Sequence, residues 1–226
     1  MLATLTPQEA LLPRYDRARA VMLELARTIG QTMLTQDMVL RLAGQIGLRS
    51  GRFEIEFAND AEVCALQDFL MYGDIRGGRN TAARYLQRFR SELTEEEQRC
   101  LEAMSAARYT LLEVREPAPG VGVHCFDVLA DREFFVHDRN WGRSTWSDGV
   151  FGSRVVDQGD FRMLTGAMLP THIGILDRLR DIASPALKAR LARRPIELGA
   201  HDQAMLQRLV IRLAKVTRIT ELVRYE

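Results

Sequence analysis

The sequence predicts an α+β protein that is mostly helical, with a central five-stranded antiparallel meander or small partial barrel. Apolar residues recur at helical spacing through residues 1–108 and again near the C-terminus, whereas residues 109–166 hold short runs rich in Val, Phe and Leu between turn residues. The 226 residues suffice for one continuous core. We therefore expect a helical region over 1–108, a β-meander over 109–166, and C-terminal helices over 167–226 that pack on the rest as one compact unit.

The helical region begins with a capping signal. Thr6-Pro7-Gln8-Glu9 has the form of a capping box with proline at the first helical position. Helical spacing of apolar residues continues from Tyr15 to Leu34, and a further helix is expected from Asp37 to Ile46, ending at Gly47. At residues 53–57 the alternation Phe-Glu-Ile-Glu-Phe predicts a half-buried strand or extended segment.

Three more helices are predicted before the strands begin. Asn59 is a suitable N-cap for a helix that ends near Tyr72, and the glycines of residues 73–78 predict a flexible break. The next helix is expected from Asn80, and a second capping box at Thr94–Glu97 opens the one after it.

The strands and the C-terminal helices follow from the change in periodicity. The predicted strands are Tyr109–Glu116, Val121–Leu129, Arg132–Asp138, Val150–Asp157 and Phe161–Thr165. Ser184-Pro185 then starts a helix that stops before Pro195. A last helix, roughly Asp202–Val223, carries an apolar stripe that either docks on the N-terminal helices or pairs with a second copy in a homo-oligomer.

Composition limits the classes of partner. The formal net charge is +1, which gives no general attraction to nucleic acid or to an anionic membrane. The three cysteines show no CxxC pairing, no secretory segment is recognised at the start, and the longest uncharged apolar stretch has 14 residues, against about 20 for a membrane span. We expect a reduced, cytoplasmic bacterial protein without a membrane segment.

The most specific site prediction depends on strand register. If Ala130-Asp131 is a two-residue hairpin loop, His124 lies opposite His137, and if residues 117–120 form the preceding loop, Glu113 faces His124. The three side chains would then form a row with neighbouring Cβ atoms about 5 Å apart. Two imidazoles and a carboxylate suit a divalent metal or acid-base catalysis. The alternative is three ordinary half-exposed strand residues, which a single bulge would separate.

Two tryptophans and a basic segment are weaker candidates. Trp141 and Trp146 lie in the predicted loop from Asp138 to Gly149, where they either contact a ligand or fold back to close the end of the strands, the interpretation we favour. Basic residues of the C-terminal third form a patch that could contact phosphates or be a solvated helical face. These residues are Arg178, Arg180, Lys188, Arg190, Arg193 and Arg194.

Several segments resemble a known group of proteins. They are LQDFLMYG, YLQRFR, LTEEEQRCLEAM, YTLLEVREP, FDVLADREFFVHDR and DGVFGSRVV. Through them the middle half of the chain is similar to uncharacterised prokaryotic proteins in which a helical half precedes a short β segment, some of which end in a zinc-binding SEC-C module. The resemblance implies this architecture and carries no activity. Because no cysteine follows Cys125, the zinc module is not expected here.

The sequence contains no P-loop, dinucleotide fingerprint, HExxH or nucleophile-elbow motif. We therefore expect a cytoplasmic, non-catalytic binding or regulatory protein whose ligand or protein partner is not identified. The first alternative is a metal-dependent hydrolase or other acid-base enzyme that uses Glu113, His124 and His137. The second is a nucleic-acid-binding regulator, which the near-neutral charge disfavours.

Overall fold

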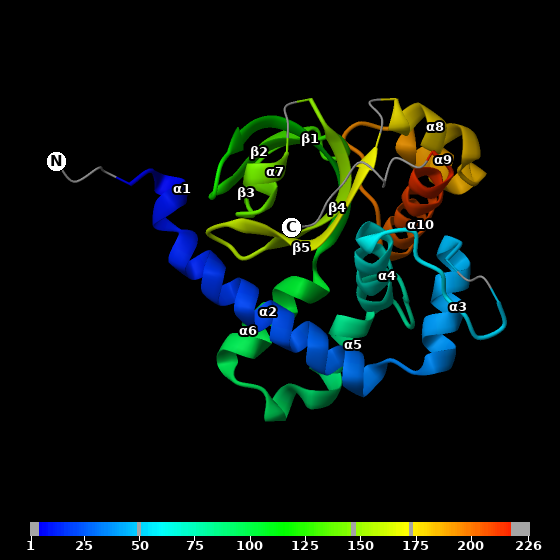
Figure 1. The fold of residues 1–226 in the computed structure, drawn as a ribbon, viewed down its shortest axis with the longest axis horizontal. Coiled ribbons are helices and arrows are strands. Elements are labelled where there is room, and N and C mark those ends of the chain that lie inside the picture. Colours follow the sequence, from blue (N-terminus) through cyan, green and yellow to red (C-terminus); the bar gives the residue numbers. More distant parts are fainter. Residues whose placement is uncertain (1–4, 49–50, 146–147, 172–173, 218–226) are drawn as a thin grey trace.

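The computed structural model describes residues 5–48, 51–145, 148–171 and 174–217, which form an α+β fold (Figure 1). Its helices are α1 (Pro7–Ala10), α2 (Leu12–Met33), α3 (Gln36–Ile46), α4 (Asp60–Tyr72), α5 (Thr81–Phe89), the 3-10 turn η1 (Arg90–Glu92), α6 (Glu95–Ser105), α7 (Trp141–Ser144), α8 (Ile175–Ile182), α9 (Pro185–Leu191) and α10 (Ala200–Val216). Its strands are β1 (Arg108–Ala118), β2 (Gly122–Asp127), β3 (Arg132–His137), β4 (Val150–Asp157) and β5 (Arg162–Thr171).

The strands pair in a closed ring in the order β1-β2-β3-β5-β4, called here the strand ring. Its neighbours are antiparallel except β3 and β5, which meet in parallel at one position, His137 opposite Met163. The predicted purely antiparallel meander is therefore wrong. β4 returns to pair through Val150–Val155 with the first half of β1, and β5 is left to close the ring against β3. β5 also continues to Thr171, beyond the predicted end at Thr165.

Local capping signals formed as predicted. Both capping boxes, at Thr6 and Thr94, are present, and Gly47 ends α3 with a φ of 80°, in the left-handed region that favours glycine. Of the strand or extended segment expected at residues 53–57, the strand is not formed. Within this segment only Ile55 makes a β-bridge. Phe53 and Phe57 are 63% and 40% exposed, so the phenylalanines of the alternating pattern do not form a buried face.

The core has an inner part and two outer parts. Figure 1 shows helix α7 enclosed by the strands. Apolar residues inside the strand ring pack around Trp141 of this helix. One outer core joins α2, α5 and α6 to Val156 and Met163 of the ring. The other joins α3, α4 and α8–α10 to the ring's opposite side, where Leu206 and Val210 of α10 are fully buried. α10 thus docks on α3 and α4, as predicted, and also on β1 and β5, which was not predicted.

The C-terminal stripe is only partly described. α8 was not predicted as a separate helix, and Ile219 and Val223 of the predicted stripe lie outside the described residues. Association with a second copy stays a prediction. Within the described part of the chain, no helix combines the length and the apolar character needed to cross a bilayer.

Candidate functional site

The predicted row of Glu113, His124 and His137 is not formed. β2 and β3 are joined by a four-residue loop rather than a two-residue one, so His124 faces Phe135 and His137 faces Gly122. Asp127 stabilises this loop by accepting hydrogen bonds from the backbone N–H groups of Leu129 and Ala130 (3.1 and 3.0 Å). A bulge between Val114 and Glu116 shifts the other hairpin, and Glu113 faces Phe126.

The three residues have separate environments. The Glu113 carboxylate accepts from Arg115 at 2.6 Å, and the exposed His124 ring lies edge-on to Phe135. The His137 side chain is buried, and its Nε2 lies 3.0 Å from the carbonyl oxygen of Gln8, which can only accept, so Nε2 carries the proton. Burial holds the pKa of His137 below its usual value, despite that hydrogen bond. Among the described residues, no three His, Cys, Asp or Glu side chains are grouped to hold a metal.

Trp141 is a core residue of the strand ring. It is 1% exposed, and its ring meets Phe151 edge-on with centroids 5.6 Å apart. Gly142 lets α7 approach the strands, because a Cβ there would lie 2.6 Å from the carbonyl oxygen of Ala118. Trp141 therefore folds back to fill the ring, as favoured, and Trp146 lies outside the described residues.

The candidate site is instead a cavity of about 850 Å³ between α2, α3, α4 and β5. Its lining is mainly apolar and includes Met22, Leu23, Ala26, Val39, Leu70 and Met71. Leu23 is 53% exposed, so part of this apolar wall meets solvent. A concave, mainly apolar site of roughly 300–1,000 Å³ with a few polar groups is typical of small-molecule binding.

Asp68, at the floor of the cavity, belongs to a buried ion pair with Arg154. Asp68 of α4 lines the cavity and receives hydrogen bonds from Thr165, Gln207 and Arg154 at 2.6, 2.6 and 3.1 Å. Arg154 of β4 also donates to Gln207 and to the carbonyl of Ala107, and its guanidinium lies 4.5 Å from the centre of the Tyr72 ring. All these groups are satisfied, so the floor joins α4, α10 and the strand ring rigidly.

The guanidinium of Arg19, at the cavity wall, has hydrogen-bond donors that are not used within the described part of the chain. Its Nη1 donates to the carbonyl of Leu164 at 2.7 Å, and its side chain is half-buried. Within the described ranges Arg19 forms no ion pair. Gly166 makes room for it, because a Cβ at Gly166 would lie 2.8 Å from Arg19 Nη2. Arg19 can therefore still bind an anionic group.

Cys64 also lines the cavity but is not arranged as a nucleophile. Burial, with a smaller contribution from the charge of Asp60, raises the pKa of its thiol. A thiol with a raised pKa is protonated at neutral pH, and the thiolate is the reactive form.

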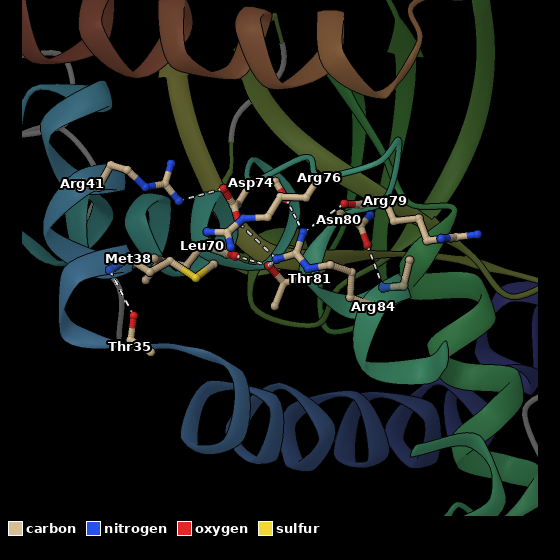
Figure 2. Close-up of polar contacts among 11 residues, drawn as sticks. Thr35, Met38, Arg41, Leu70, Asp74, Arg76, Arg79, Asn80, Thr81 and Arg84 are labelled. Carbon is tan, nitrogen blue, oxygen red and sulfur yellow. Dashed lines mark hydrogen bonds and ion pairs between the residues drawn. The ribbon is translucent and has the colours of Figure 1, made fainter. Parts of the chain in front are cut away.

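A polar cluster outside the cavity fixes its α3 wall. Figure 2 shows Arg41 of α3 and Arg84 of α5 reaching the carboxylate of Asp74, at 2.9 and 3.1 Å. Arg76 adds a third ion pair at 2.9 Å, and Thr81 donates to the carbonyl of Leu70, a residue of the cavity wall. The pKa of Asp74 is lowered, because the hydrogen bond from Arg41 and the three positive charges outweigh the effect of burial. The cluster thereby ties α3, α4 and α5 together.

Sequence reasoning missed Arg19, Asp68 and Gly166. Two signals were available for the floor. Asp68 falls on the apolar face of a predicted helix, between Leu66 and Phe69, and Arg154 falls within an otherwise apolar strand. Charged residues at positions predicted to be buried need a partner, and these two are each other's partner. Arg19 has no such signal, because α2 carries several arginines on its solvent side.

The comparisons with known proteins give one match. A family model described as "Family of unknown function (DUF7986)" matches residues 9–188, which include the strand ring, the cavity and the helices that form its walls. No curated protein and no solved structure matches the chain. The resemblance to SEC-C-bearing proteins stays a prediction.

Proposed function

We propose, for a chain that belongs to this family of unknown function, that it is a non-catalytic binding protein whose cavity takes a small amphipathic anion. The observation that carries the proposal is a half-buried Arg19 without a carboxylate partner among the described residues, at the wall of a mainly apolar cavity of about 850 Å³. A cation in such a place favours a ligand that brings its own negative charge.

The rest of the lining defines the other end of the ligand. Apolar side chains of α2, α3 and α4 suit an aliphatic body, which gains about 25 cal/mol for each Å² removed from water. The ligand class is therefore an aliphatic chain with one carboxylate. The raised pKa of the Cys64 thiol favours binding over nucleophilic chemistry.

The cysteines support a reducing compartment. Cys64, Cys100 and Cys125 are all free, and burial raises the pKa of Cys100 to about 11. Free, unreactive thiols are usual in cytoplasmic proteins. We include a cytoplasmic location in the proposal on this ground.

The test compares carboxylates with matched alcohols. Titration calorimetry with octanoate, decanoate and dodecanoate should show saturable binding, and decanol should bind at least about tenfold more weakly than decanoate, because a hydrogen bond to a charged group contributes about 1.5–3 kcal/mol. Arg19→Gln should remove the difference between acid and alcohol. Equal affinities for acid and alcohol in the wild type, or no binding of any carboxylate, would overturn the proposal.

Arg27→Gln is the matched control. Arg27 also lies on α2 and lines the cavity, but its guanidinium is paired with Glu24 at 3.1 Å. Its substitution should leave the preference for the carboxylate unchanged. If mass spectrometry detects chemical conversion of decanoate incubated with the protein, the non-catalytic part of the proposal is contradicted.

A further inference from the structure

Three arginines of the strand ring line one pocket. β1 and β3 are each antiparallel to β2, and β3 is parallel to β5, so the odd-numbered strands all run in the same direction. Each begins with an arginine: Arg108 in β1, Arg132 in β3 and Arg162 in β5. Met163, the residue after Arg162, pairs with His137 at the far end of β3, so shared direction alone does not bring the three together. They nevertheless line one pocket, and we call this set the arginine rim.

The arginine rim surrounds a small pocket. All three arginines line a cavity of about 120 Å³, together with Ala103 and Ala106 and with Val155 and Asp157 of β4. This volume is about four times the share of one water molecule in liquid water, which is enough for one tetrahedral anion. Three guanidinium groups around such a volume match the several acceptor oxygens of a phosphate.

Part of the hydrogen-bonding capacity of the rim is unused. Arg108 pairs with the buried Asp127 at 2.7 Å. Arg162 Nε lies 3.1 Å from Asp157 Oδ2 but is not aligned to donate to it, and this N–H is buried without an acceptor among the described groups. Arg132 is exposed, lies over the Phe134 ring at 5.8 Å, and forms no ion pair within the described part of the chain.

A larger cavity lies beside this pocket. It has a volume of about 480 Å³, lies between α2, α6 and the β4–β5 turn, and shares Ala103 and Asp157 with the pocket of the rim. Glu96 and Glu102 line it and are held by Arg17 and Arg90, at 2.7 and 2.8 Å. Carboxylate oxygens fixed in this way accept hydrogen bonds from hydroxyl groups.

We propose that the arginine rim binds the phosphate group of a small phosphate monoester, whose hydroxyl-bearing body lies in the adjoining cavity between α2 and α6. This site is separate from the cavity between α2, α3, α4 and β5, called here the aliphatic cavity, and the proposal does not rest on the proposed function. A sugar phosphate has both required parts, a dianionic phosphate for the three arginines and hydroxyl groups for Glu96 and Glu102.

The test uses glucose 6-phosphate, inorganic phosphate and glucose as probes in titration calorimetry at low ionic strength. Glucose 6-phosphate should bind saturably and more tightly than inorganic phosphate, and glucose should not bind. Arg132→Gln should weaken binding of glucose 6-phosphate at least about tenfold, because it removes charge-assisted hydrogen bonds. Arg88→Gln is the matched control: Arg88 is also exposed, lies over a phenylalanine ring at 5.1 Å, and should not affect binding.

Several outcomes would overturn the proposal. Absence of binding by both phosphate compounds, or unchanged affinity of Arg132→Gln, would remove the phosphate site. Equal affinities for inorganic phosphate and glucose 6-phosphate would remove the adjoining cavity from the site. A short single-stranded DNA that binds more tightly than glucose 6-phosphate and displaces it would show a nucleic-acid surface instead.

Discussion

At the centre of the molecule Arg154 and Asp68 each keep only 3% of their side chains exposed, whereas Arg108 and Arg162 of the arginine rim keep 31% and 33%. Every nitrogen of the Arg154 guanidinium donates within the chain, to Asp68, Ala107 and Gln207. The rim retains a buried N–H without an acceptor on Arg162. The same side-chain chemistry thus joins secondary structure where its donors are all used, and offers a site for an anion where they are not.

The largest expected effect is at the buried pair. Asp68→Ala leaves Arg154 buried without its carboxylate partner and should lower the free energy of unfolding by about 3–5 kcal/mol in urea denaturation. Asp160→Ala is the control, because Asp160 and its partner Arg14 are 55% and 60% exposed and such a pair contributes about 0–1 kcal/mol. Equal losses in the two variants would contradict the contrast between buried and exposed pairs.

Arg19 is half-buried, between the buried and the exposed pair in its accessibility. The variant Gly166→Ala tests what holds its side chain in place. Gly166 has a φ of +108°, so alanine should cost about 1–3 kcal/mol in backbone strain, measured by urea denaturation, and its Cβ should also displace Arg19. Gly159→Ala is the control, since Gly159 has a φ of +87° with open space around its Cβ position. Only Gly166→Ala should weaken decanoate binding; the same affinity in both variants would show that Arg19 does not depend on Gly166.

His137, the last residue of β3, makes the stability of the protein depend on pH. His137 has a folded-state pKa below the unfolded value of 6.5, so the unfolded chain binds more protons as the pH falls. The contribution of neutral His137 to stability is present above about pH 6.5 and is lost as the pH falls below it. Urea denaturation at pH 7.5 and 5.5 should show a smaller difference for His137→Gln than for the wild type. An unchanged difference would mean that other groups cause the pH dependence.

The smallest expected effect on stability is at the rim itself. Arg132 is exposed and pairs with no carboxylate in the described ranges, so Arg132→Gln should change the free energy of unfolding by less than about 0.5 kcal/mol. Thermal unfolding without ligand checks this. A loss as large as that of Asp68→Ala would mean that the rim is a structural element.

Local signals in the sequence predicted local structure well. The capping boxes at Thr6 and Thr94, the stop at Gly47 and the cap at Ser184 depend on neighbouring residues only, and all four formed. The existence of the strands was predicted for the same reason, because each is a short apolar run between turn residues.

Register and closure were not predictable from these signals. Asp127 caps a four-residue loop through its carboxylate, and this shift separates His124 from His137. The pairing of β3 with β5 depends on how the ring closes in space. Arg132 and Arg162 meet only as a result of that closure, so their proximity could not be derived from spacing along the chain.

Helix α2 is a wall of both cavities. It has 22 residues, which makes it about 33 Å long, with Arg19, Met22 and Leu23 on the aliphatic cavity and Arg17 and Val21 on the cavity beside the rim. If one ligand displaces α2, the other cavity changes as well. Thermodynamic linkage requires the effect to be reciprocal: the factor by which glucose 6-phosphate changes the affinity for decanoate equals the factor by which decanoate changes the affinity for glucose 6-phosphate.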